Sequence, residues 1–457
     1  MILQKRQIGK LLAFVFLLSL YFVLNEDNRT NFSSIIFFYT ISFIVFLALV
    51  VSRFLSFREM IWLAILSQLL TCFFQPSLSN DYYRFLWDGE LFWNGINPYD
   101  YTPNEISEMN SYQTNYYLQD LYNNLSSLSQ RNYSCYPTVN QFYFIIGSAF
   151  SSSIVFNAII LKLTIILTQI IGAVYLIKLL AIFKLNANRI WLLFLNPLWI
   201  IESTGNLHFE AVMMSFLFIA FYYVFNKKLG VAGLLFGISV QIKLIPLLLL
   251  PFFFRLLGFF KASYFYLIVF IVSIGFQFVF MNNLNYENFI ASLRLYFKAF
   301  EFNSFLLHHV VEYGKYQYGW NLAQRYAPIL AQISIFIILS LALYGNAVKW
   351  EVIFKRMTLA FFFYLLFSST IHPWYIIPLL SLSLFTNYTF PIVWSFAIML
   401  SYYFYRDLNN QDFYYRLLVN LEYGIVLVVF LFEVFSKKTL IKKLNLKHYL
   451  IQTEPSS

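Results

Sequence analysis

The sequence predicts an all-α, polytopic integral membrane protein with about 14 membrane segments, in a range of about 12 to 14. Hydrophobic residues make up 60% of the 457 residues, charged residues only 11%, and the mean hydropathy is +0.66. Soluble domains carry roughly 25% charged residues, so this composition cannot build a water-facing surface. The apolar residues are also grouped in runs that are separated by short basic loops. Lipid is therefore the expected solvent for most of the chain.

The individual spans follow from the apolar runs and the residues that bound them. The first run, Leu11 to Leu24, lacks a small-residue cleavage site after it, so we expect an uncleaved first span. The predicted spans are 9–25, 34–52, 59–75, 154–178, 190–202, 208–226, 230–244, 245–258, 262–281, 325–345, 357–372, 374–387, 390–405 and 416–435. Several are shorter than the roughly 20 residues that a full crossing needs. Prolines occur in such short runs at Pro246, Pro251, Pro373 and Pro378, where we expect broken or re-entrant helices.

Charge patterning predicts the orientation of these spans. With a cytoplasmic N-terminus, most lysines and arginines fall in inner loops, as the positive-inside rule requires. Most carboxylates then fall on the outer side. This orientation makes the chain a single membrane domain, 1–457, with two long outer loops, 76–140 and 282–324, that carry interfacial helices. A basic cytoplasmic tail covers 436–457. Long loops in a compact chain are usually functional.

Composition also narrows the classes of ligand. The net charge of +10 does not indicate nucleic acid, because the basic residues sit in short loops between apolar runs. The two cysteines, Cys72 and Cys135, cannot form a cysteine metal site, and two unpaired thiols are favoured over a disulfide. We expect no metal centre and no cofactor, although a divalent cation is compatible with the sequence.

The first polar constellation follows span 59–75 at the outer side. Asp81 comes a few residues after the end of that span, and Arg84 and Asp88 follow. A carboxylate at headgroup depth is partly desolvated, which raises its pKa and makes it a competent general base. Arg84 could hold an anionic group or pair with Asp81 or Asp88. The structural alternative is an interfacial amphipathic helix with a solvated polar face.

Four further polar clusters lie at outer ends of apolar runs. Acids and histidines beside membrane helices are costly unless they are paired or used. An isolated lysine in an apolar segment needs an anion or a route along which its head reaches water. Each cluster could instead be a loop whose polar groups are hydrogen-bonded locally, but convergence of the clusters on one cavity is the simpler account. The residues are Glu202, Asn206, His208 and Glu210; Lys243; Glu301 and Asn303, with His308 and His309 nearby; and His372, Trp374 and Tyr375.

These segments resemble, in the same order, those of GT-C superfamily glycosyltransferases, in the bacterial mannosyltransferase-like branch related to GPI-anchor mannosyltransferases. The strings Asp81-Tyr-Tyr-Arg-Phe-Leu-Trp-Asp88-Gly and Gly95-Ile-Asn97-Pro-Tyr99 are similar to the first outer loop of that family. The later segments around Glu202, Lys243, Glu301 and His372 are similar to its other shared segments. The resemblance covers roughly residues 75 to 380.

The resemblance implies a GT-C-like fold in the bacterial inner membrane and transfer of a hexose, mannose in the first place, at the outer face. It implies a polyprenyl-phosphate-linked sugar as donor, a lipid or glycan as acceptor, and membrane lipids as surroundings. Asp81 matches the family's proposed base, with Asp88 second; the remaining cluster residues, together with Asn97 and Tyr99, would bind substrate or the lipid phosphate. Glu210 stands where some relatives have aspartate, and two spans precede the one that leads into the motif loop.

Other classes of function stay open at this stage. A transporter or flippase for a lipid-linked saccharide would need charge at the membrane midplane, where Lys162, Lys243 and Glu422 are the candidates. A glycan polymerase or ligase would rely on outer cations such as Arg294 and Arg325. The carboxylates crowd the outer edge instead, which favours surface chemistry. The chain contains no phosphate-binding loop and no dinucleotide fingerprint.

Overall fold

The computed structural model describes residues 2–281, 283–298, 301–345, 349–406 and 413–436, and in these the prediction of an all-α membrane protein is confirmed. Helices account for 78% of the structure, without strands in the described part. The long helices are α1 (Ile2–Leu24), α2 (Phe32–Ser52), α10 (Ile154–Ile182), α13 (Glu210–Phe225), α16 (Phe259–Phe280), α19 (Ala323–Leu343), α20 (Trp350–Phe367) and α23 (Phe413–Phe435).

The predicted count of about 14 membrane segments is not confirmed. Among the described residues, six helices are long and apolar enough to cross a membrane, or seven if one bent pair counts as a single span. Several predicted spans are instead short apolar helices, because prolines and polar motifs divide them. These are α14 (Leu229–Val240), η4–α15 (Ile245–Leu257), η5–α21 (Pro373–Ser383) and α22–η6 (Phe390–Tyr405). The predicted span 59–75 corresponds to the 14-residue helix α3 (Phe57–Leu70).

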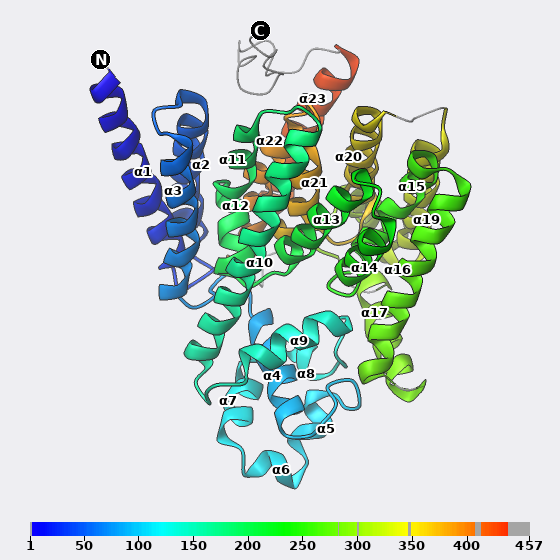
Figure 1. Cartoon of the computed structure of the whole chain (residues 1–457). Helices are drawn as coiled ribbons and strands as arrows, with labels where there is room; N and C mark the ends of the chain where they lie inside the picture. Colours follow the sequence, from blue (N-terminus) through cyan, green and yellow to red (C-terminus); the bar gives the residue numbers. More distant parts are fainter. Residues whose placement is uncertain (1, 282, 299–300, 346–348, 407–412, 437–457) are drawn as a thin grey trace.

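The region predicted as the first long outer loop is a compact helical unit. It contains α4 (Asp81–Trp93), α5 (Pro103–Ser107), α6 (Asn110–Gln113), α7 (Tyr116–Asn124), α8 (Ser127–Gln130) and α9 (Thr138–Gly147). Figure 1 shows this unit at one end of the helix bundle, opposite the end where α1 begins and α23 ends. The second predicted loop carries α17 (Asn283–Lys298) and α18 (Leu306–Tyr318).

Local sequence explains where several of these elements begin. Ser56 and Glu59 form a capping box at the start of α3, and Thr102 and Glu105 form another at the start of α5. Asn115 accepts a hydrogen bond from the Leu118 N–H at the start of α7. Polar side chains thereby satisfy orphan N–H groups at helix starts on both sides of the bundle.

Buried charges join segments that are distant in the chain. The Lys162 ammonium in α10 donates 2.7 Å hydrogen bonds to the carbonyl oxygens of Thr71 and Phe74. Arg189 likewise donates to the carbonyl oxygens of Leu384 and Thr386, each at 2.7 Å. Each cation binds backbone oxygens at the ends of short elements, so its burial also fixes those ends.

The two cysteines and the basic tail were also predicted from the sequence. Cys72 and Cys135 are thiols and not a disulfide, as expected. The basic tail predicted over 436–457 lies outside the described residues apart from Ser436.

The contact between α4 and α9 depends on a glycine. A Cβ atom on Gly89 would lie 2.2 Å from the Phe144 carbonyl oxygen, which belongs to the backbone and cannot move aside cheaply. We therefore expect Gly89→Ala to lower the free energy of unfolding by about 1–3 kcal/mol. Thermal unfolding of the purified protein in detergent would measure this. The matched control is Gly275→Ala in α16, where the added Cβ would meet no heavy atom within 4 Å. Equal melting temperatures for the two variants would contradict the prediction.

Candidate active site

Asp81 is the first residue of α4 and lies where several charged segments meet. Its carboxylate is partly exposed, and its backbone N–H donates to the Ser79 hydroxyl at 3.3 Å. Burial by the surrounding protein raises the pKa of Asp81, while the charges of Lys243 and Arg29 act in the opposite direction and that of Glu210 adds to the rise. Asp81 is therefore a carboxylate whose environment favours proton uptake relative to a solvated one.

The second segment is a broken helix. Asn196 caps a short turn, accepting a hydrogen bond from the Leu198 N–H at 3.0 Å, and Pro197 follows at the first helical position. The chain then forms a wide π-type turn, Ile200–Gly205, before α13 starts at Glu210. The two parts are bent by 108° relative to each other. The break therefore exposes residues 206–209 to the neighbouring segments instead of continuing a single span.

Backbone strain accompanies this break. Leu207 is fully buried and adopts a φ of +64°, which is rare for a bulky residue. The His208 N–H donates to the Glu202 carbonyl oxygen at 3.0 Å. Because the surrounding structure has to compensate for such strain, its occurrence beside buried polar side chains is typical of functional sites.

Glu202 connects the broken helix to the start of α4. Its fully buried carboxylate accepts hydrogen bonds from the Tyr402 hydroxyl at 2.8 Å and from the Asn206 amide at 3.3 Å. The Asn206 side-chain oxygen in turn accepts from the Leu78 N–H at 3.2 Å. The chain of contacts from Glu202 to Leu78 therefore positions the backbone just before Asp81.

Glu210 and Lys243 form a close ion pair. The Lys243 ammonium lies 2.8 Å from a carboxylate oxygen of Glu210, which is fully buried, whereas 22% of the lysine side chain is exposed. Lys243 follows the end of α14 and reaches the first turn of α13. The sequence suggested that this lysine needs an anion, and a buried carboxylate supplies one.

Aromatic rings from three segments form a stack beside these charges. The His208 ring stacks on Trp374 with ring centroids 3.4 Å apart, and Trp374 stacks on His372 at 4.4 Å. The opposite face of His372 lies 4.7 Å from Phe302, which pairs through its backbone with Thr370. Burial and the nearby Lys243 charge lower the pKa of His372 to about 3. The stack is therefore uncharged at His372 near neutral pH.

Tyr375 belongs to the same cluster. Its ring packs edge-on against His372, with centroids 5.5 Å apart, and the charges of Glu210 and Asp81 both act on its hydroxyl. The structure thus brings together predicted site residues from four segments of the chain: Asp81; Glu202, Asn206, His208 and Glu210; Lys243; and His372, Trp374 and Tyr375.

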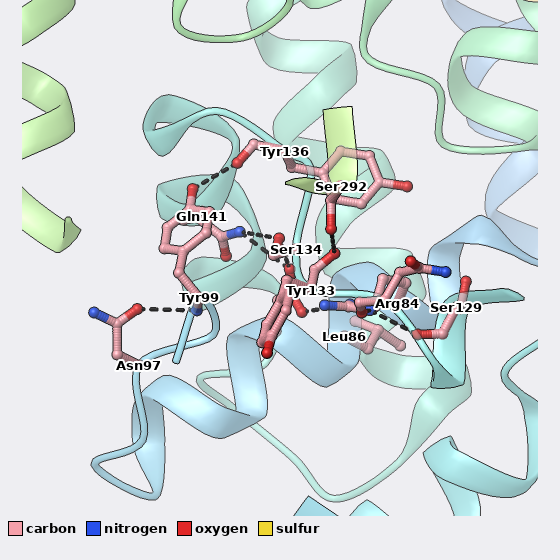
Figure 2. A network of polar contacts seen from close by, with 12 residues as sticks. Arg84, Leu86, Asn97, Tyr99, Ser129, Tyr133, Ser134, Tyr136, Gln141 and Ser292 are labelled. Atoms are coloured by element: carbon pink, nitrogen blue, oxygen red, sulfur yellow. Dashed lines mark hydrogen bonds and ion pairs between the residues drawn. The ribbon is translucent and has the colours of Figure 1, made fainter. Parts of the chain in front are cut away.

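Arg84 and Asp88 form a separate network one and two turns further along α4. The Arg84 Nε donates to Asp88 at 2.7 Å, and its Nη1 donates to the carbonyl oxygens of Ser129 and Asn132, each at 2.9 Å. Asp88 also accepts hydrogen bonds from Ser134 and Gln141. Of the two alternatives for Arg84, the structure has the pair with Asp88. Figure 2 shows this network linking α4 to the segment before α9.

Asn97 and Tyr99 also make structural contacts. The Asn97 amide donates to the Phe280 carbonyl oxygen at 2.5 Å, and its oxygen accepts from the Tyr99 N–H at 3.1 Å. The fully buried Tyr99 hydroxyl donates to the Tyr136 carbonyl oxygen at 2.5 Å (Figure 2). The Asn97 side chain holds the outer helical unit against α16, and the Tyr99 ring packs edge-on against Phe289 of α17, with centroids 6.0 Å apart.

The Glu301 and Asn303 side chains likewise have partners outside the cluster. Glu301 lies 3.5 Å from the His308 ring nitrogen and accepts from the Ser304 hydroxyl at 3.1 Å. The Asn303 amide donates to both carboxylate oxygens of Glu422 at 3.2 Å. Their neighbour Phe302, which the sequence analysis did not single out, is the residue of this segment that joins the aromatic stack.

Sequence reasoning also missed Arg29, Tyr402 and Tyr405. The Arg29 guanidinium lies 4.3 Å from the centre of the Tyr405 ring, and its charge acts on Asp81. A usable signal existed for Arg29, because an arginine between the first two spans, next to Glu26 and Asp27, departs from the positive-inside pattern. The two tyrosines carry no such signal in a chain with 35 tyrosines.

The cluster combines groups suited to group transfer. Asp81 can accept a proton, Lys243 and Arg29 can stabilise negative charge, and the rings can pack against a sugar. Within the described ranges, no group of three or more His, Cys, Asp and Glu side chains is arranged to hold a metal ion.

Comparison with known proteins identifies a family whose model matches the chain. The family model described as alpha-(1->6)-mannopyranosyltransferase, N-terminal domain, matches residues 17–258. This range includes Arg29, Asp81, the broken helix and Lys243. No curated protein and no solved structure shows significant similarity to the chain.

The Glu210–Lys243 pair predicts a specific pattern of stability. Lys243→Met leaves a fully buried carboxylate without its counter-charge, so we expect the free energy of unfolding to fall by about 3 kcal/mol. Adding Glu210→Gln should recover most of this loss, because the uncompensated charge is then removed. Thermal unfolding in detergent would test both variants. A double variant no more stable than Lys243→Met would show that the ion pair is not the cause.

Proposed function

Since this chain belongs to the alpha-(1->6)-mannopyranosyltransferase family, we propose that it transfers mannose from a polyprenyl-phosphate donor to a lipid or glycan acceptor at the outer face of the membrane. That it is a membrane glycosyltransferase of the α-mannosyltransferase type follows from the family and from its apolar helices. The donor, the acceptor, the mechanism and the face are the proposal.

The observation that carries the proposal is that Asp81 lies within electrostatic reach of the Lys243–Glu210 ion pair and of Tyr375, which packs on the aromatic stack. In the proposed step, the Asp81 carboxylate takes the proton from an acceptor hydroxyl. The acceptor oxygen attacks the anomeric carbon of mannose, and the bond from that carbon to the phosphate oxygen breaks. The products are the new glycoside, polyprenyl phosphate and a protonated Asp81, which returns its proton to solvent.

The stereochemistry restricts the donor. A single displacement inverts the anomeric centre, so an α-linked product requires a β-linked mannosyl phosphate. The leaving group is an anion, and Lys243 is better suited than Arg84 to stabilise it. Lys243 is partly exposed and its charge acts on Asp81. The Arg84 guanidinium already binds Asp88 and two carbonyl oxygens.

The arrangement of the chain supports an outer active site. Figure 1 shows α4–α9 at the end of the bundle opposite the start of α1 and the end of α23. Among the described residues, most lysines and arginines belong to the loops at the end where α1 begins and α23 ends, which the positive-inside rule assigns to the cytoplasm. Asp81 would then face outward, in the bacterial inner membrane. A lipid-linked sugar meets the need for an activated donor there, since nucleotide sugars are cytosolic.

Transport of the lipid-linked sugar is less well supported. A flippase would be expected to have polar groups available along the bundle. Here Lys162 binds two backbone carbonyl oxygens, and Glu422 accepts hydrogen bonds from Asn303 and Trp394. These two candidates for midplane charge therefore have structural partners.

Removal of the proposed base tests the central assignment. We expect Asp81→Asn to lower kcat by about 10²–10⁴-fold, because the amide cannot accept the proton. The assay follows transfer of radiolabelled mannose from polyprenyl-phosphate mannose by the protein in lipid nanodiscs. The matched control is Glu90→Gln, a partly buried acid on the same helix, which should keep activity within about threefold of wild type. Full activity in Asp81→Asn would remove Asp81 as the base.

The pH dependence offers a second test. Only the ionised carboxylate of Asp81 accepts a proton, and burial raises the pKa of Asp81. Activity should therefore be lost as the pH falls through this raised pKa, so the acid limb of kcat/KM should lie above the ordinary aspartate value of about 3.9. Steady-state rates measured over a range of about pH 3 to 8 would locate this acid limb. A limb at or below the ordinary value would contradict the role of Asp81.

A further inference from the structure

Arg29 is a cation at the rim of the candidate site. It lies in the connection between α1 and α2, and its side chain is partly exposed. The guanidinium lies over the Tyr405 ring, 4.3 Å from its centre. Such stacking holds the guanidinium plane in a defined orientation while its N–H donors at the edge stay available.

Contacts between rings join Arg29 to the site. The Tyr405 ring centre lies 5.8 Å from that of Phe302, which stacks on His372. Tyr405 also lies 6.0 Å from Tyr402, whose hydroxyl binds Glu202. Arg29 therefore packs at one end of the same aromatic stack whose other end is His208. Its charge also reaches Asp81, as does that of Lys243.

Among the described residues, no carboxylate forms an ion pair with the Arg29 guanidinium. Lys243, in contrast, is paired with Glu210. Within this part of the chain, an anionic ligand would therefore gain more from Arg29 than from Lys243 alone.

We propose that Arg29, held over the Tyr405 ring, binds the phosphate of the lipid-linked donor and of the released polyprenyl phosphate. The inference rests on the proposed function. A guanidinium binds phosphate oxygens through two parallel N–H donors. The donor is a phosphodiester with one negative charge, and the leaving group becomes a monoester with up to two. Arg29 therefore binds the departing phosphate more strongly than the donor, which lowers the barrier to transfer.

The same chemistry occurs in anionic phospholipid headgroups, so the experiment has to separate the two sources. Wild type, Arg29→Ala, Arg29→Lys and Arg406→Ala are placed in nanodiscs of phosphatidylcholine alone, and again with added phosphatidylglycerol. Arg406 is the matched control, because it too lies over a tyrosine ring, Tyr403 at 5.6 Å, but is not among the main charges that act on Asp81. The inhibition constant for polyprenyl phosphate is measured in each, since it does not depend on the fraction of active protein.

We expect Arg29→Ala to weaken inhibition by polyprenyl phosphate about 10–100-fold in phosphatidylcholine, the range for hydrogen bonds to a charged group. Arg29→Lys should recover part of the loss, because a lysine keeps the charge but not the paired donors. Arg406→Ala should match wild type. An unchanged inhibition constant in Arg29→Ala would overturn the inference. So would an effect of Arg29→Ala that is present only when phosphatidylglycerol is added, which would assign Arg29 to headgroups.

Direct binding separates this inference from the proposed function. Fluorescent polyprenyl phosphate is titrated into Asp81→Asn and into Asp81→Asn with Arg29→Ala, so that no turnover is required. Binding to the first but not the second supports the role of Arg29. Equal binding to both overturns that role and leaves the proposed donor intact. Absence of binding to Asp81→Asn and to wild type overturns both, because the chain would then not recognise the lipid phosphate.

Discussion

Every charge that this chain places among its apolar helices needs a partner inside the protein, because lipid supplies none. Lys162 and Arg189 meet this constraint with backbone carbonyl oxygens at the ends of short elements. The negatively charged counterpart is Glu433, which accepts hydrogen bonds from the backbone N–H groups of Thr389 and Phe390 at the start of a helix. The hydrogen bonds that make burial of each charge possible are thus the same ones that cap the end of a neighbouring helix. The many short helices around the site depend on it.

The same constraint shapes the candidate site. A continuous helix through residues 197–225 would hold Glu202 and Glu210 inside one span. The break at 206–209 lets Glu202 bind Tyr402 and Asn206, and lets Glu210 meet Lys243 from another helix. Asn206 also contacts the backbone before α4. The position of Asp81 therefore depends on a network that exists to satisfy buried carboxylates, so stability and the proposed chemistry share the same residues.

The contacts of the outer helical unit change along its sequence. The start of α4 carries Asp81 toward the charged cluster. One and two turns later, Arg84 and Asp88 bind each other and the segments before and within α9. Asn97 holds the unit to α16, and Tyr99 packs against Phe289 of α17. Neighbouring residues of one motif thus have different contacts, and among them only Asp81 is the proposed base.

The membrane class, the all-α fold and the family could be predicted from the sequence, because composition, apolar runs and the ordered motifs do not depend on packing. It also identified most of the cluster, since acids, histidines and an isolated lysine beside apolar runs are conspicuous. Which of them meet depends on how distant segments pack together. Arg84 and Asp88 belong to the same motif as Asp81, but one and two turns along α4 they face other neighbours and bind each other. Phe302, not Glu301 or Asn303, joins the ring stack. Arg29, Tyr402 and Tyr405 enter the site through contacts between distant segments, and a local pattern cannot encode such contacts.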